Sequence, residues 1–231
     1  GVLGPRRGVR ATVSPMTTTV DLLEGIATTR AIRRYTPEPV TDDELATILF
    51  AATRAPTGSN RQPVRFIVLR DGAVAAEAKR LIGTAARAVW DNKSERDGYK
   101  EGSGAEADSP KARMERTMRR YVDEFEAVPC LIFPCLVRYR QPTPFEGSSV
   151  YPAVQNLLLG ARQYGLGGCL TTLHIHHEAE IKALLGIPDQ FDTYALVPLG
   201  YPRDRFGPLR RRPVEDVTFV DHWDQPFGAQ G

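Results

Sequence analysis

Residues 128–137 constrain the fold of this chain most, because this ten-residue stretch is almost entirely apolar. A membrane-spanning helix needs about 20 such residues, so the stretch is too short to cross a bilayer. Its length is that of a β-strand, and an apolar run without alternation is typical of a strand buried on both faces. We therefore expect this segment to form a strand inside the protein.

Apolar residues at helical spacing and turn signals divide the rest of the chain. Thr41 and Glu44 form a capping box, which predicts the start of a helix. The core face of that helix would consist of Leu45, Ile48, Leu49 and Ala52. We expect further helices over residues 20–29, 73–90, 111–126, 150–164 and 178–185, with Gly165 and Gly186 ending the last two. We expect further strands over residues 64–69, 168–172 and 194–199, and a polar, mobile loop over residues 91–110. This mixture predicts a single α+β domain over residues 16–231.

The charge balance and the cysteine content exclude several classes of protein. The chain has 30 Lys and Arg against 28 Asp and Glu, and the net charge of +2 argues against a nucleic-acid partner. Its three cysteines are an odd and small number, which is typical of free thiols in a reducing compartment. We expect Cys130 and Cys135 to be buried like small apolar residues, and the protein to be cytoplasmic with no membrane partner.

The N-terminal residues 1–15 carry three arginines and no acidic residue. A secretory signal requires an apolar stretch of roughly 7–15 residues, and these residues contain none. Because Met16 resembles a natural start, we interpret residues 1–15 as an upstream extension or disordered arm without a role in the chemistry. A transit peptide and a nucleic-acid-binding arm are the alternatives.

Three segments carry residues suited to binding a ligand. Residues 30–34 hold three arginines, whose paired donors at a helix end can grip a phosphate. Residues 56–62 are small and polar, and residues 165–174 are dense in glycine, so both could present backbone amides to a planar ligand. Each segment alone also fits a structural role: a solvated charge cluster, a surface turn, or a helix cap.

Metal and hydrolase chemistry find less support. His174, His176 and His177 could place metal ligands, but no Asp, Glu or Cys with suitable spacing stands nearby except Glu178, so capping or solvated histidines fit better. Gly-x-Ser-x-Gly does not occur, which excludes a nucleophile elbow. Cys169 with His174 as a nucleophile and base is the weaker alternative.

Taken in order, these segments resemble the nitroreductase family of FMN-dependent oxidoreductases. The matching stretches are TTRAIRRY (28–35), APTGSNRQP (55–63), QNLLLGARQYGLG (155–167), CLTTL (169–173) and the segment from LGIP to RRRP (185–213). The resemblance covers about residues 20–218 and is weakest over 91–127, the variable lid in this family. It implies a nitroreductase-like α+β fold with a central, mostly antiparallel sheet flanked by helices, and an intertwined homodimer with FMN at the interface.

The resemblance also assigns roles to individual residues. Arg30, Ala31 and Arg33, completed by Arg210 and Arg211, would hold FMN by its phosphate, and Arg33 would also stabilise the anionic reduced flavin near N1. Residues that reach the flavin of the other subunit would be Pro56, Thr57, Gly58, Ser59 and Asn60, with Gln62 in support. The isoalloxazine ring would lie along Leu170, Thr171, Thr172 and Leu173. No protein residue would be catalytic, because FMN carries the chemistry, and no metal is implied.

This chain departs from the family pattern at two places. Thr29, Arg30 and Ala31 stand where many members carry two arginines and a serine, so one phosphate contact and one hydroxyl are missing. Val64 stands where many members carry Trp, which loosens the packing behind the 56–62 loop.

The implied activity is a ping-pong reduction of nitroaromatic, quinone or similar acceptors with NADPH or NADH as the electron donor. Reductive dehalogenation, enoate reduction and an oxidase role are alternatives within the same fold. Candidate substrate contacts in the lid are Trp90, Tyr99, Arg113 and Tyr121. The alternative outside catalysis is a flavin-binding storage or sensor protein with little turnover.

Overall fold

A five-stranded antiparallel sheet forms the centre of the computed structural model, which describes residues 20–139, 141, 143 and 145–228. The middle strand β2 (Cys130–Val137) pairs with β1 (Val64–Leu69) along one edge. Along its other edge it pairs with β4 (Phe191–Thr193) and β5 (Val197–Gly200). The short β3 (Gly167–Gly168) extends the sheet beyond β5. The interpretation of residues 1–15 lies outside the described residues.

Both faces of β2 are buried, as the sequence predicted. Leu131, Phe133 and Cys135 belong to one apolar cluster, whereas Cys130, Ile132 and Leu136 belong to another. Neighbouring residues of a strand point to opposite faces, so the alternation assigns one cluster to each side of the sheet. All three cysteines are buried and free, and burial raises the pKa of Cys130 to about 12.

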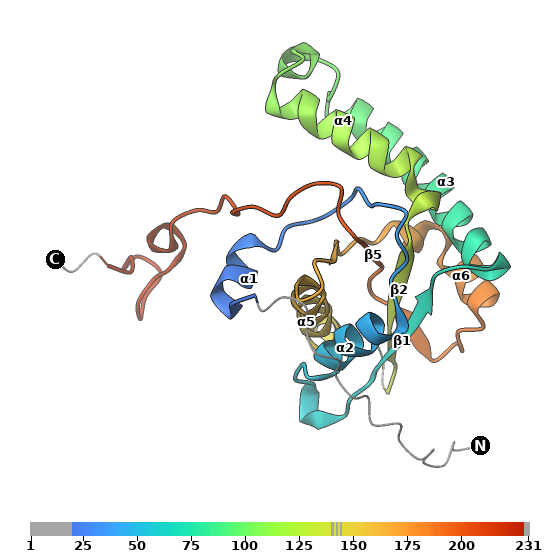
Figure 1. Ribbon diagram of the computed structural model, residues 1–231. Helices are drawn as coiled ribbons and strands as arrows, with labels where there is room; N and C mark the ends of the chain where they lie inside the picture. The colour runs from blue at the N-terminus through green and yellow to red at the C-terminus, as the bar shows by residue number, and fades with distance from the viewer. Residues whose placement is uncertain (1–19, 140, 142, 144, 229–231) are drawn as a thin grey trace.

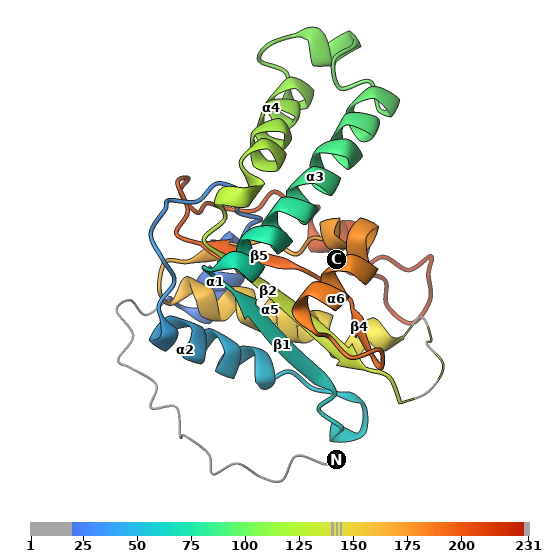
Figure 2. The ribbon, with the colours of Figure 1, turned by 90° about the vertical axis from the view of Figure 1, so that its right-hand side faces the viewer.

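Helices cover the two faces of this sheet. Figure 1 shows α2 (Asp42–Thr53) and α5 (Tyr151–Arg162) on one side, and α6 (Glu178–Leu185) with the lower part of α3 (Ala73–Arg96) on the other. Helix α3 continues upward and forms a hairpin with α4 (Pro110–Asp123), which projects from the sheet (Figure 2). This arrangement of a mostly antiparallel sheet flanked by helices confirms the expected fold class.

Local signals for helix ends hold in the structure. The Thr41 hydroxyl accepts a hydrogen bond from the amide of Glu44 over 3.3 Å, and the Glu44 carboxylate accepts one from the amide of Thr41 over 2.7 Å. Gly186 ends α6 with a φ of +63°, and Gly165 follows α5 with a φ of +71°. Such backbone angles favour glycine, which has no β-carbon to clash.

The expected mobile loop over residues 91–110 is wrong in its first part. Helix α3 continues to Arg96, and a short 3-10 helix (Gly102–Ala105) follows. Asp91 pairs with Arg119 over 2.7 Å, and Ser94 donates a hydrogen bond to Glu115 over 2.9 Å, so the polar residues bind to α4. Their polarity therefore serves a helix–helix contact.

Two of the expected strands are also shorter than predicted. Of the strand expected over 194–199, only the part from Val197 onward forms β5, and β4 ends before it at Thr193, because residues 194–196 oppose only residues 133–134 of β2 and form a bulge. The bulge falls beside Pro134, which has no N–H to donate. The strand expected over 168–172 is reduced to β3, with one further bridge between Thr171 and Leu196.

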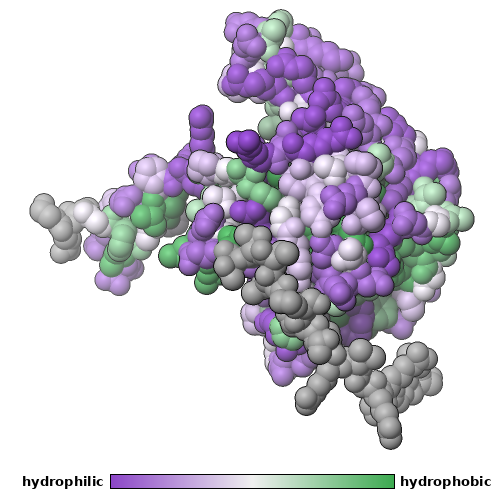
Figure 3. Space-filling model, in the orientation of Figure 1, coloured by the Kyte–Doolittle hydropathy of each residue, from purple (hydrophilic) through white to green (hydrophobic). Residues whose placement is uncertain are grey.

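Apolar side chains remain exposed at both ends of the described chain. Helix α1 (Leu22–Thr28) exposes its apolar residues, with Leu22 at 68%, and Trp223 in the C-terminal tail is 80% exposed. The tail extends away from the sheet in Figure 1, and Figure 3 shows hydrophobic patches on it. None of the described helices is both long and apolar enough to span a bilayer.

Candidate functional site

The arginine segment, residues 29–35, is fixed to the sheet by its apolar members. Ile32 and Tyr35 are buried, and the Ile32 amide donates a hydrogen bond to the carbonyl of Gly168 over 3.0 Å. The Tyr35 hydroxyl lies 2.6 Å from the carbonyl of Ile32 and 3.2 Å from that of Pro198. Burial of these two residues leaves Arg30, Arg33 and Arg34 on the outer side.

Helix α4 overhangs this segment and closes a cleft of about 480 Å³. Figure 1 shows α4 running diagonally above the blue segment that follows α1. The floor of the cleft is formed by residues 30–34, with Asp204 at its side. The roof consists of Pro110, Arg113, Met114 and Thr117. These four positions recur at the spacing of a single helix face.

Positive charge dominates the cleft. Of its four arginines, Arg34 pairs with Asp204 over 3.1 Å. Within the part of the chain that the structure describes, Arg30 and Arg33 form no ion pair with an acidic side chain. Guanidinium groups without partners beside exposed backbone are the donor set that a phosphate requires. The cleft therefore fits the phosphate of a nucleotide-like ligand.

The departure from the family pattern at Thr29 has a structural counterpart. The Thr29 hydroxyl is buried and has no hydrogen-bond partner among the described residues, and the same holds for Nε of Arg34. Unpaired buried polar atoms are costly, so they mark places where a ligand or water completes the bonding. Arg34 lies in the cleft floor, and Thr29 directly precedes the floor residues in the chain.

A cluster of protonated groups lies beneath Arg33. The Tyr121 hydroxyl lies 3.8 Å from the Cys169 thiol, and both side chains are buried. Burial raises the pKa of Cys169, although Arg33 acts in the opposite direction. Burial likewise raises the pKa of Tyr35 and of Tyr121 well above the usual range. Burial thus disfavours the thiolate form of Cys169. Among the described contacts, the Cys169 thiol lies next to the Tyr121 hydroxyl, whereas Nε2 of His174 lies 3.4 Å from the carbonyl of Thr193, so the structure does not support the Cys169–His174 pair.

The segment 170–173 follows Cys169 and forms an open surface beside the arginine segment. Leu170 is 41% exposed, whereas the preceding Cys169 is buried. Thr171 exchanges two backbone hydrogen bonds with Leu196, of 2.9 Å and 2.8 Å. This pairing holds the segment while leaving Leu170 and Thr172 exposed, as a platform for a planar ligand requires.

The 56–62 loop lies far from the arginine segment in the single chain. Figures 1 and 2 show it at the opposite end of β1 from the α3–α4 hairpin. Ser59, Asn60 and Gln62 have φ of +52°, +50° and +50°, although none of them is glycine. The Thr57 hydroxyl accepts a hydrogen bond from the Gln62 amide over 3.0 Å and stabilises this strained backbone.

The two C-terminal arginines of the prediction do not line the cleft. The chain passes the arginine segment in antiparallel fashion, since the Arg203 amide binds the Arg34 carbonyl and the Leu209 amide binds the Ala27 carbonyl. Arg210 and Arg211 follow beyond this point and are exposed, and Nη1 of Arg211 donates a hydrogen bond to the carbonyl of Arg210. The structure therefore brings Arg30, Ala31 and Arg33 together, but not Arg211 with them.

Of the four lid residues offered as substrate contacts, only Arg113 lines the cleft. Trp90 and Tyr121 are buried in the apolar core, and the Trp90 ring lies 5.1 Å from that of Tyr99. Sequence reasoning missed Met114, Thr117 and Asp204. The spacing of Pro110, Arg113, Met114 and Thr117 marks one helix face, but the sequence gives no sign of what that face opposes.

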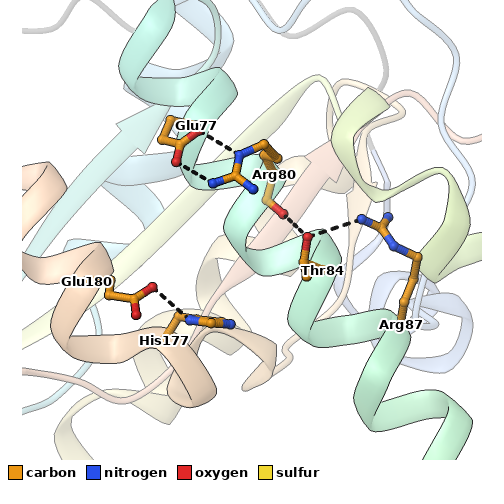
Figure 4. A network of polar contacts seen from close by, with 6 residues as sticks. All are labelled: Glu77, Arg80, Thr84, Arg87, His177 and Glu180. Atoms are coloured by element: carbon orange, nitrogen blue, oxygen red, sulfur yellow. Dashed lines mark hydrogen bonds and ion pairs between the residues drawn. The ribbon is translucent and has the colours of Figure 1, made fainter.

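The three histidines do not converge on a metal site. His174 is buried against Phe133, with ring centroids 5.6 Å apart, whereas His177 pairs with Glu180 over 2.8 Å. Figure 4 shows His177 turned toward Glu180, near the Glu77–Arg80 ion pair of α3. No set of three metal-ligating side chains occurs among the described residues.

Comparisons with known proteins agree with this geometry. Residues 26–201 match the model of the Nitroreductase family. A Thermus thermophilus protein named NADH dehydrogenase is 33% identical over 194 residues, which are 82% of this chain and 90% of the relative. A Thermotoga neapolitana protein named iodotyrosine deiodinase is 26% identical over 76% of this chain and 85% of its own. A crystal structure of an FMN- and NADPH-dependent nitroreductase from a Sphigopyxis strain superimposes with a TM-score of 0.64 at 22% identity, covering 87% of this chain and 99% of that one. The matched region includes both the arginine segment and the platform.

Proposed function

The chain belongs to the nitroreductase family, and from that premise we propose that it is an FMN-dependent oxidoreductase. In this proposal it uses NADPH or NADH to reduce nitroaromatic, quinone or similar acceptors by a ping-pong mechanism. The observation that carries the proposal is the cationic cleft beside an exposed platform, and every residue of either except Asp204 lies inside the family match. When bound, FMN supplies the redox chemistry, and the protein supplies binding, orientation and electrostatics.

We assign the phosphate contact to Arg30 and Arg33, with the exposed Ala31 between them. Their guanidinium groups have no acidic partner among the described residues, so they can bind an anion without first breaking an ion pair. Arg33 is also near enough to Cys169 to influence its pKa, which places its charge close to the start of the platform. A cation there favours negative charge on a ligand that lies along Leu170, Thr171, Thr172 and Leu173.

We further propose that the active form is a homodimer with FMN at the interface. The loop of Pro56, Thr57, Gly58, Ser59, Asn60 and Gln62 lies at the far end of β1 from the cleft, so it can reach a flavin only in a second copy (Figures 1 and 2). The exposed apolar residues of α1 and of the tail provide the surface that such an interface would cover. In that assembly Arg210 and Arg211 would complete the phosphate site.

The purified protein tests the cofactor and the turnover separately. We expect a yellow preparation with flavin absorption bands, FMN uptake by any apo fraction, and NADPH or NADH oxidation that a nitroaromatic acceptor accelerates. A colourless protein that takes up no FMN would contradict the proposal. Bound FMN that neither nicotinamide reduces would favour the storage or sensor function.

A further inference from the structure

We propose that Arg113 determines substrate specificity by pairing with a carboxylate group on the aromatic acceptor. This inference rests on the proposed function and goes beyond it, because it names the chemical class of the acceptor. Arg113 lies in the roof of the cleft, on the opposite side from Arg30 and Arg33. Its side chain is exposed, so it is available to a ligand that enters below α4.

The cleft contains more positive charge than the FMN phosphate and the acidic side chain of the cleft would neutralise. Four arginines line it, and Arg34 is matched by Asp204. A phosphate monoester carries up to two negative charges at neutral pH, which would balance Arg30 and Arg33. Arg113 then remains without a counter-charge in the described part of the chain, since its Nη1 contacts only the backbone carbonyl of Asp108, over 2.7 Å.

The neighbours of Arg113 suit an aromatic acceptor. Met114 and Pro110 share its helix face and present apolar surface to the cleft. The Thr117 hydroxyl donates its hydrogen to the carbonyl of Arg113 over 2.8 Å, so this hydroxyl can only accept a further bond. A flat ring below Met114 would therefore find one strong donor in the roof, and that donor is a cation.

Arg116 provides a matched control on the same helix. Its Nη1 donates a hydrogen bond to the carbonyl of Ala107 over 2.7 Å, just as Arg113 binds the carbonyl of Asp108. Both arginines thus support the same turn before α4, and both are exposed, but Arg116 does not line the cleft. Arg113→Gln and Arg116→Gln each remove one positive charge and one hydrogen bond to a backbone carbonyl. They differ because Arg113 lines the cleft and Arg116 does not.

The test measures binding without turnover, using benzoate and its neutral analogue benzamide on the FMN-loaded protein. The readout is the perturbation of flavin absorbance on titration. We expect the wild type to prefer benzoate, and Arg113→Gln to weaken benzoate about tenfold or more while changing benzamide less than twofold. Arg116→Gln should match the wild type, and Arg113→Lys should restore part of the preference. In turnover, Arg113→Gln should raise KM for 4-nitrobenzoate and leave KM for 4-nitrobenzamide unchanged.

Several outcomes would overturn this assignment. Equal affinity of the wild type for benzoate and benzamide would contradict the proposed carboxylate site without contradicting the proposed function. A loss of FMN affinity in Arg113→Gln would place Arg113 in the phosphate site. A rise in KM for NADPH but not NADH, with benzoate binding unchanged, would assign the cation to the phosphate of the donor. Failure of the wild type to bind FMN at all would instead contradict the proposed function.

Discussion

The amide of Ile32 donates a hydrogen bond to the carbonyl of Gly168 over 3.0 Å, and this bond joins the arginine segment to the edge of the sheet. The contact is close because neither Gly167 nor Gly168 has a side chain. A β-carbon on Gly167 would lie 2.6 Å from Ile32, and one on Gly168 would lie 2.4 Å from the carbonyl oxygen of Pro198. The two glycines therefore set the distance between the arginines and the platform.

Gly168→Ala should destabilise the protein and weaken FMN binding together. Its new methyl group meets backbone at Pro198, which cannot move aside as a flexible side chain would. We expect the free energy of unfolding to fall by about 2–3 kcal/mol, the range of severe steric substitutions. Urea denaturation and FMN titration measure the two effects. Gly207→Ala, where the added methyl meets nothing within 4 Å, serves as the control and should change neither.

Arg33→Gln should weaken FMN binding without unfolding the protein. A hydrogen bond to a charged group contributes about 1.5–3 kcal/mol, so the dissociation constant should rise roughly 10- to 100-fold. Quenching of FMN fluorescence on binding gives this constant directly. The control is Arg80→Gln, which removes an arginine that pairs with Glu77 on α3 (Figure 4) and does not line the cleft. An unchanged dissociation constant in Arg33→Gln would refute the assignment of the phosphate site.

Val64→Phe should stabilise the chain by filling a cavity. About 140 Å³ of space lies beside Val64, behind the 56–62 loop, and is lined by residues that include Thr57, Gln62 and Phe66. Filling a cavity with a larger apolar side chain commonly adds about 1 kcal/mol of stability. Chemical denaturation measures the gain, and Val64→Ala should shift stability in the opposite direction. A lower stability for Val64→Phe would mean that the space cannot accept a ring.

His174 should make stability fall as the pH drops below about 6.5. Burial lowers the pKa of His174 from its ordinary value of 6.5, because the charged form would lose its hydration. Between the native-state pKa and 6.5, only the unfolded chain takes up the proton, so acid favours unfolding in that window. Below the native-state pKa the effect levels off.

Comparison of two histidine variants isolates this effect. His174→Phe keeps an aromatic ring against Phe133 but cannot titrate, so it should lose less stability than the wild type between pH 7.5 and pH 5. His176→Gln removes an exposed histidine of the same short helix and serves as the control variant. The measurement is the denaturation midpoint of each variant across this pH range. Parallel curves for His174→Phe and the wild type would show that His174 does not contribute to the pH dependence of stability.

Deletion of residues 214–231 should impair both dimerisation and FMN binding. The described part of this tail exposes Val217, Phe219 and Trp223, which a second copy would cover. Light scattering measures the mass in solution, and absorbance measures bound FMN. We expect the full chain to be a dimer and the shortened chain to shift toward monomer with less flavin. Trp223→Ser should give a smaller change in the same direction, whereas a full-length monomer that binds FMN would contradict a shared site.

Some structural features could be predicted from the sequence because their causes are local. The capping box of Thr41 and Glu44 and the left-handed turn at Gly186 depend on a few neighbouring residues. The apolar run of β2 is equally direct, since it has no face that water could solvate. The family resemblance gave Arg30, Ala31 and Arg33, which the structure does bring into one cleft.

Other features could not be predicted because they depend on partners distant in the sequence. The polar residues at the end of α3 predicted a loop, because the sequence does not show that Asp91 and Ser94 contact Arg119 and Glu115 of α4. The division of β4 from β5 follows from where Pro134 falls on the neighbouring strand. Neither partner can be inferred from local spacing.

The sequence by itself determined the buried strand, the helix ends and the arginine segment, since each follows from local chemistry. Only the tertiary structure decided that Arg113 faces those arginines. Helix α4 is held over them by its packing against α3 and by the burial of Tyr121 against Cys169, a contact that spans 48 residues of chain. The sequence of a charged helix face is the same whether that face meets water or a ligand cleft. Only the packing of α4 therefore determines that Arg113 lies in the cleft.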